Sequence, residues 1–267
     1  MNLHYVPLVQ IQRELHDIPR GMERFKQYLR TVGAKDSDHL ELPSLLIMNP
    51  MGKEHMTALL DALLKLDADV VAEEATAEAS AQLENEPGEF KVGLVVADDL
   101  MGGWTNRYAS EFSLRFPKVP TAARKGRLPR WLKHYWITAV QWSSEAPTQK
   151  SVREATLTAV YRIAYIQQHG YPKTVREMLA QEGAVLARAG CTTPHLDPED
   201  IAYTREVLKP FLDADDQRTA IECLFGDAAG RTLGFTPRGL SLCAGLALAL
   251  HDETSKVSTS SESEKVL

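Results

Sequence analysis

The spacing of apolar residues predicts alternating strands and helices in the middle of the chain. Three short apolar runs, residues 45–48, 92–97 and 136–142, are typical of buried strands, and the last is rich in aromatic and β-branched residues. After the first run, the apolar residues have the spacing of one face of a helix. They are Met56, Leu59, Leu60, Leu63 and Leu64.

The alanine- and glutamate-rich residues 67–84 favour a further helix. Strand and helix patterns together predict an α/β core at residues 41–172, in which a small, mostly parallel sheet of three to four strands is flanked by helices.

Helical patterns dominate the two ends of the chain. Residues 1–40 contain two short helices, interrupted at residues 19–21, that we expect to pack on the core. Residues 173–252 form a predicted all-helical region. Thr174 and Glu177 have the spacing of a capping box there, and Thr236 with Pro237 is a candidate start for its last helix. Residues 253–267 are poor in apolar residues and are predicted to be a disordered tail.

Composition and charge narrow the classes of protein. The chain has 267 residues, a formal net charge of −6 and three cysteines without CxxC spacing. A negative net charge argues against a general nucleic-acid binder, and the cysteines suggest neither a disulfide framework nor a zinc site. No apolar run approaches the roughly 20 residues that span a bilayer, and the first residues lack a secretory signal pattern. We therefore expect a cytoplasmic protein without a membrane partner.

Residues 91–107 are the best candidate for a functional site. An apolar run ends there in Asp98 and Asp99, and a Gly pair, Trp104, Asn106 and Arg107 follow. Ligands of open α/β sheets bind beyond the carboxyl ends of the strands, where these polar residues are expected. Side chains alternate along a strand, so we expect one of the two carboxylates to face the site and the other to cap the loop.

Polar residues also follow the other two predicted strands and could converge with Asp98 and Asp99 if the strands are parallel. Asp98, Asp99 and Glu145 are the candidate catalytic residues, and the same three with His55 would offer Mg²⁺ or Mn²⁺ a mostly oxygen site. The candidate substrate-binding residues are Asn49, Lys53, Trp104, Asn106 and Arg107. The alternative is that these Asp and Asn residues are only turn formers and helix caps.

Two classes of function therefore stay open. The first is an enzyme acting on a small polar or phosphorylated substrate at the strand ends, with a metal ion as a possible assistant. The second is a non-enzymatic binding or regulatory protein, because residues 115–136 contain many basic and aromatic residues and no Asp or Glu. An anionic partner would then contact Arg124, Lys125, Arg127 and Arg130. The sequence identifies neither the reaction nor the substrate.

Overall fold

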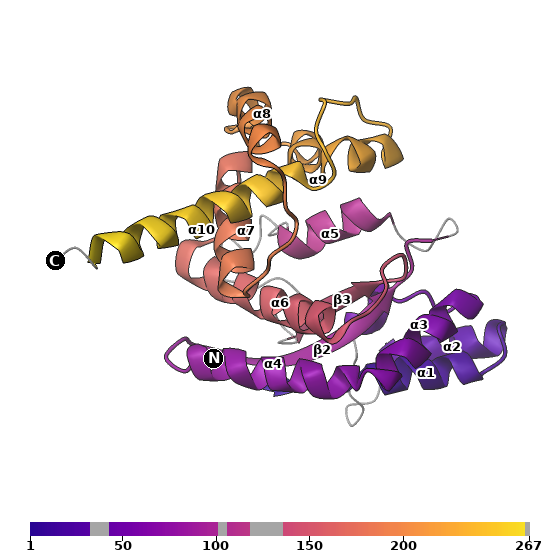
Figure 1. Cartoon of the computed structure of the whole chain (residues 1–267). Helices are drawn as coiled ribbons and strands as arrows, with labels where there is room; N and C mark the ends of the chain where they lie inside the picture. The colour runs from indigo at the N-terminus through magenta and orange to yellow at the C-terminus, as the bar shows by residue number, and fades with distance from the viewer. Residues whose placement is uncertain (33–42, 101–105, 118–135, 265–267) are drawn as a thin grey trace, which may run out of the picture. The chain divides into compact units, whose positions relative to one another are not determined.

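The computed structural model describes residues 1–32, 43–100, 106–117 and 136–264, with side chains as far as Lys256. It is a mixed α/β fold with a three-stranded parallel sheet flanked by helices, as predicted (Figure 1). The chain divides into two compact units. The first is made from Met1–Arg107 and Val119–Ala164, and the second from Tyr108–Lys118 and Tyr165–Leu267.

The sheet of the first unit has the strand order β1-β2-β3, and both strand pairs are parallel. Strands β2 (Glu89–Ala97) and β3 (Trp136–Trp142) confirm two of the predicted strands. The third strand, β1, is Asn2–Tyr5, which the sequence pattern did not reveal.

The prediction of a strand at residues 45–48 is wrong, because the first three residues of this run belong to the 3-10 helix η1 (Pro43–Ile47) and Met48 follows it directly. A short apolar run does not distinguish a buried strand from a buried helical turn by its spacing alone. Leu45 and Met48 are fully buried, so the pattern identified the burial of this segment but not its backbone conformation.

A glutamine side chain completes the edge of β2 where β1 ends. Strand β1 pairs only with residues 89–92 of β2. Beyond them, the side chain of Gln12 in α1 (Val9–Asp17) forms hydrogen bonds with the backbone of this edge. Its Oε1 accepts from the amide of Val96 at 2.8 Å, and its Nε2 donates to the carbonyl oxygen of Leu94 at 3.2 Å. The fully buried Gln12 therefore satisfies two backbone groups that would otherwise lack partners at an unpaired edge.

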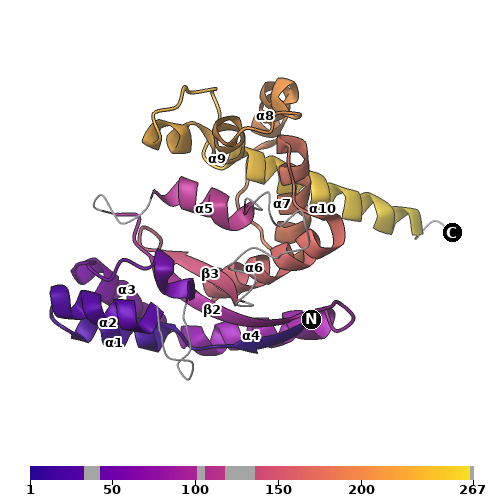
Figure 2. The ribbon, with the colours of Figure 1, turned by 180° about the vertical axis from the view of Figure 1, so that it is seen from behind.

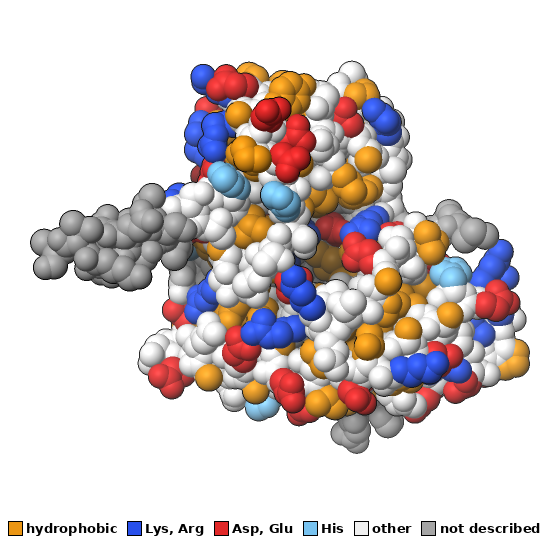
Figure 3. All heavy atoms as spheres, in the orientation of Figure 1, with side chains coloured by type: hydrophobic (Ala, Val, Ile, Leu, Met, Phe, Trp, Pro, Cys, Tyr) orange, Lys and Arg blue, Asp and Glu red, His pale blue; other side chains and the backbone are white. Residues whose placement is uncertain are grey.

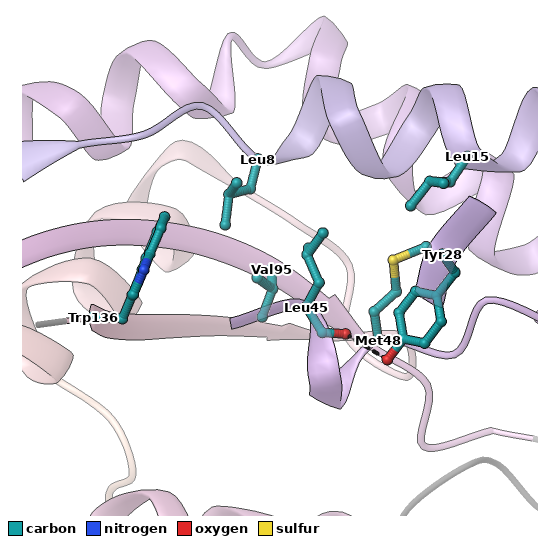
Figure 4. Close-up of a cluster of buried hydrophobic side chains, with 7 residues drawn as sticks. All are labelled: Leu8, Leu15, Tyr28, Leu45, Met48, Val95 and Trp136. Carbon is teal, nitrogen blue, oxygen red and sulfur yellow. Dashed lines mark hydrogen bonds between the residues drawn. The ribbon is translucent and has the colours of Figure 1, made fainter. Parts of the chain in front are cut away.

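A buried apolar cluster fixes the N-terminal helices against the sheet (Figure 4). Its residues lie in or next to α1, α2 (Met22–Val32), η1 and the two longer strands. They are Leu8, Leu15, Tyr28, Leu45, Met48, Val95 and Trp136. Gly93 makes room for it, because a Cβ there would lie 2.5 Å from Cδ1 of Leu8. Tyr28 adds a hydrogen bond of 3.2 Å to the carbonyl oxygen of Leu45.

Three further helices belong wholly or in part to the first unit (Figure 2). They are α3 (Glu54–Lys65), α4 (Ala68–Gln82) and the N-terminal part of α6 (Gln149–His169). Helices α4 and α6 are joined by the ion pair of Arg153 with Glu78 and by a hydrogen bond of 2.9 Å from Tyr161 to Gln82. On α3, Met56, Leu59, Leu60 and Leu63 are buried, as their spacing predicted.

The second unit is helical in its described residues. It contains most of α5 (Arg107–Arg115), then α7 (Val175–Arg188), α8 (Pro198–Leu208), η4 (Lys209–Phe211), α9 (Gln217–Thr232) and α10 (Ala244–Glu264). Thr174 and Glu177 form the predicted capping box at the start of α7. Helix α7 crosses α10 at Gly183, where a Cβ would lie only 2.6 Å from the carbonyl oxygen of Ala249.

Two predictions for this region are wrong. The last helix starts at Ala244 rather than after Thr236, and it continues to Glu264 through most of the segment predicted to be disordered. The polar residues just past its apolar part have partners that composition does not reveal: Arg205 of α8 binds Asp252 at 2.7 and 2.9 Å, and Lys256 pairs with Glu253 at 2.8 Å. Among the helices that the structure describes, none has the length and apolar character needed to cross a membrane.

Candidate functional site

Asp98, directly after β2, lies at the centre of the first half of the site. Its side chain is only 3% exposed and accepts hydrogen bonds from Asn49 Nδ2 at 2.8 Å and from the amide of Leu100 at 3.1 Å. His55 Nε2 lies 3.0 Å from its Oδ1. Burial raises the pKa of Asp98, but the hydrogen bonds from His55 and Asn49 more than offset this, so the pKa lies below its ordinary value. Asp98 is therefore ionised at neutral pH.

The ionised carboxylate fixes the tautomer of His55, which lies in the first turn of α3. A carboxylate only accepts, so Nε2 of the neutral imidazole carries the proton and Nδ1 carries the free electron pair. The His55 side chain is 25% exposed, whereas that of Asp98 is 3% exposed. The pair thus combines a buried negative charge with a partly accessible proton acceptor.

Asp99 forms the second half of the site with residues that follow β3. Its Oδ1 accepts from the amide of Ser144 at 2.8 Å, and its Oδ2 accepts from Ser144 Oγ at 2.6 Å. Arg107 Nη1 lies 3.5 Å from Asp99 Oδ2, and its Nη2 forms an ion pair with Glu145. The guanidinium also lies over the ring of Trp142, with its central carbon 5.4 Å from the ring centroid.

Arg107 is a candidate substrate-binding residue, and two carboxylates of the protein balance its positive charge. It holds the loop after β3 to the loop after β2. This arrangement is that of a structural anchor, in which a planar fork of donors fixes several acceptors at once.

Ser143 connects the two halves. Its Oγ lies 3.1 Å from Asp98 Oδ1 and 3.0 Å from Asp99 Oδ1, and it accepts from the amide of Asp99 at 3.1 Å. A hydroxyl has one proton, so Ser143 donates to these two carboxylates in alternation or shares the proton between them. The sequence pattern marked this strand end as polar but assigned no role to Ser143.

The structure brings together Asn49, His55, Asp98, Asp99, Arg107 and Glu145, which the sequence pattern had placed at three separate strand ends. The first of these ends follows a 3-10 helix rather than a strand, but its loop still reaches the carboxyl end of β2. Each carboxylate also binds one loop amide, Leu100 for Asp98 and Ser144 for Asp99. The capping role therefore applies to both, and the contact with His55 distinguishes Asp98.

The predicted metal set of Asp98, Asp99, Glu145 and His55 is not gathered as a metal site. Among the residues that the structure describes, no group of three or more His, Cys, Asp or Glu side chains is placed to hold a metal ion. His55 and Asn49 bind the carboxylate of Asp98. The guanidinium of Arg107 lies between the carboxylates of Asp99 and Glu145.

The other residues that were predicted to bind a substrate or an anionic partner lie at the margin of this network or outside the described residues. Lys53 is exposed at the N-cap of α3, and Asn106 is half-buried directly before α5. Trp104 lies outside the described residues, as do the four proposed contacts to an anionic partner, Arg124, Lys125, Arg127 and Arg130.

Arg115 and Trp136, at the two ends of the basic-aromatic segment (residues 115–136), make structural contacts within the protein. Arg115 forms ion pairs with Glu111 and Glu182, and its side chain is 18% exposed. Trp136 is a member of the buried cluster on the sheet. Neither residue is therefore available as a freely accessible contact for an anionic partner.

Sequence reasoning missed two residues that lie next to the loop carrying Asn49. Arg24 of α2 binds the carbonyl oxygen of Gly52 at 3.3 Å, and its neighbour His16 comes from the end of α1. No local pattern marks them, because they reach this loop from helices that were assigned only a packing role. A buried Arg or His on an amphipathic helix becomes visible only once the tertiary contacts are known.

Comparison with known proteins identifies a similarity to a bacterial protein. The chain is 27% identical over 135 residues to the uncharacterized protein YjfC of Bacillus subtilis (strain 168). The match covers 47% of this chain and 44% of YjfC, so the chain spans less than half the length of that protein. No family model matches the chain, and no solved structure matches it.

Proposed function

We propose that the chain is a cytoplasmic enzyme that acts on a small polar substrate, with His55 as the general base. The observation that supports this proposal is the 3.0 Å contact between His55 Nε2 and the buried Asp98 at the carboxyl end of the central strand. A carboxylate that orients a histidine and balances its charge is a recurring arrangement for proton transfer.

The reaction that fits this pair begins with an O–H group of the substrate or with water. His55 Nδ1 takes the proton as the oxygen attacks an electrophilic centre, and the imidazolium then returns the proton to the leaving group. Asp98 stabilises the imidazolium without taking the proton, because the Coulomb attraction between them is strongest when His55 is charged. Such general-base catalysis contributes about 10²- to 10⁴-fold to a rate.

Asp99, Arg107 and Glu145 have a different part in this proposal. They fix the loop after β3 to the loop after β2 and so hold Ser143 next to Asp98. The three residues thereby stabilise the position of the base but do not themselves transfer the proton. Hydrolysis and transfer to a second hydroxyl are both compatible with this geometry.

The test compares His55→Gln with His4→Gln on a panel of phosphate esters, carboxylic esters and amides. Gln retains a donor toward Asp98 but not the basic nitrogen, so we expect kcat/KM to fall about 10²- to 10⁴-fold with little change in the unfolding temperature. His4 is an exposed residue of the same unit, and its variant is expected to keep full activity. Wild-type activity in His55→Gln would overturn the assignment, as would the absence of turnover across the panel for the wild-type protein.

A further inference from the structure

The loop that carries Asn49 and leads to His55 is held by two arginines, Arg20 from the turn between α1 and α2 and Arg24 from the first turn of α2. Arg20 Nε donates to the carbonyl oxygen of Met51 at 3.0 Å, and Arg24 Nη1 donates to that of Gly52 at 3.3 Å. Two positive charges are thus attached to the backbone that immediately precedes the proposed base.

Arg24 is a buried cation whose acceptors are all neutral. The residue is 7% exposed, and its other acceptors are the carbonyl oxygens of Ile18 at 2.6 Å and His16 at 3.2 Å and the His16 Nδ1 atom at 3.3 Å. Burial lowers the pKa of Arg24, and the charge of Arg20 lowers it further. Within the described residues no carboxylate forms an ion pair with Arg24, although an unpaired buried charge is costly.

The same group of residues contains a buried donor without an acceptor. His16 is 6% exposed, and burial, followed by the charge of Arg24, lowers its pKa to about 4, so it is neutral at physiological pH. Its Nδ1 accepts from Arg24, so its Nε2 carries the proton, and this atom has no hydrogen-bond partner. Each guanidinium nitrogen of Arg24, in contrast, has at least one acceptor in the described structure.

Such unsatisfied buried groups are rare and call for an explanation, which a bound ligand supplies. Arg24 connects His16 to the carbonyl oxygen of Gly52, three residues before the proposed base. An acceptor group bound in this group of residues would therefore lie near the loop that carries His55.

The exposed rim beside these donors is also basic. Arg20 and Lys53 are exposed and form no ion pair within the described residues, whereas the nearby Asp17 pairs with Arg13 and Glu23 pairs with Arg30. Glu54, next to Lys53, is exposed and adds one negative charge. Figure 3 shows Lys and Arg side chains and a histidine, with Asp and Glu side chains among them, on the side of this face that α2 and α3 occupy in Figure 1. Helix α3 begins here, and a helix N-terminus favours negative charge.

We propose that Arg20, Arg24, Lys53 and His16 form an anion subsite that binds a phosphate group of the substrate. The inference rests on the proposed function, since it places the phosphate beside the hydroxyl or water that His55 activates. A phosphate monoester fits because its oxygens accept several hydrogen bonds at once and its charge compensates the buried Arg24 as well as the exposed pair. The substrate class is therefore a small phosphorylated molecule.

The test measures inorganic phosphate binding to the full chain by calorimetry and by NMR of the histidine side chains. Arg20→Gln and Lys53→Gln change exposed groups and are each expected to weaken binding roughly 3- to 5-fold, as for a solvent-screened charge. Lys65→Gln is the matched control, because Lys65 is exposed at the opposite end of α3, and it is expected to leave the affinity unchanged. Phosphate is also expected to shift the Nε2–H resonance of His16 and the ring resonances of His55.

Failure of this subsite is distinguishable from failure of the proposed function. Absence of phosphate binding, equal affinity in Arg20→Gln, Lys53→Gln and Lys65→Gln, or unshifted His16 and His55 resonances would each overturn the subsite, whatever the activity of His55→Gln. If phosphate binds as expected while His55→Gln retains full turnover, the subsite stands and the assignment of the base is wrong.

Discussion

Asp98 and Asp99 are neighbours in the sequence and share the hydroxyl of Ser143, yet they have different partners. Asp98 binds an amide side chain and a histidine, whereas Asp99 binds a serine and lies beside an arginine that is always charged. A histidine changes its charge near neutral pH and an arginine does not. The difference indicates that Asp98 is suited to proton transfer and Asp99 to holding the loops.

The second unit supports this distinction, because it repeats the arrangement around Asp99. Arg115 lies between Glu111 and Glu182, and Arg238 and Arg218 both pair with the buried Glu222. Arg115 thereby joins α5 to α7, and Arg238 joins the segment before α10 to α9. The carboxylate–histidine pair of Asp98, in contrast, has no counterpart among the ion pairs of the described part of the second unit.

The largest expected effect comes from exchanging each carboxylate for its neutral isostere. Asp98→Asn removes the charge that stabilises the imidazolium, and we expect kcat/KM to fall about 10²- to 10⁴-fold. Asp99→Asn leaves His55 and its partner in place and is expected to lower kcat/KM less than tenfold. Both variants lose hydrogen bonds, so the activity is measured per folded molecule, with circular dichroism as the check. Equal losses in the two variants would show that the two carboxylates act as one unit.

Much of the site was predictable because local sequence determines the ends of long buried strands. The run 92–97 and the run 136–142 were identified correctly, and in a parallel sheet their carboxyl ends must lie at one edge. That single topological rule places Asp98 and Asp99 near Ser144 and Glu145. The rule does not say which side chain pairs with which, since that depends on the path of each loop.

The parts that could not be predicted depend on contacts between distant segments. Strand β1 has only four residues and is stable because it pairs with β2, more than eighty positions later in the chain. The edge role of Gln12 has the same origin. Likewise, Arg24 and His16 occupy helical positions that appear unremarkable until the loop before α3 is placed against them.

The second prediction concerns only the half of the candidate site that contains Asp99. Arg107→Lys retains the charge but loses the fork of donors that reaches Asp99, Ser144 and Glu145 and the planar contact with Trp142. We expect the free energy of unfolding to fall by about 1–2 kcal/mol, measured by urea denaturation.

Arg153→Lys is the control for this variant. Arg153 forms a comparable two-oxygen contact with Glu78, but both side chains are at least 40% exposed, so the loss is expected to stay below about 0.5 kcal/mol. If Arg107→Lys is no more destabilising than Arg153→Lys, Arg107 does not anchor the loops.

The smallest expected effect is the pH dependence that Asp98 contributes to stability. The pKa of Asp98 is lower in the folded chain than its ordinary value near 3.8, so the unfolded chain binds more protons in this range. The stabilisation is therefore fully present above the unfolded pKa and is lost as the pH falls through the folded pKa. The difference in unfolding free energy between wild type and Asp98→Asn should therefore narrow as the pH falls below about 5. Asn49→Ala removes one of the hydrogen bonds that lower this pKa, so in that background the narrowing should be smaller and should be complete at a higher pH. A difference that stays constant down to pH 3 would mean that Asp98 does not hold the charge on which its pairing with His55 depends.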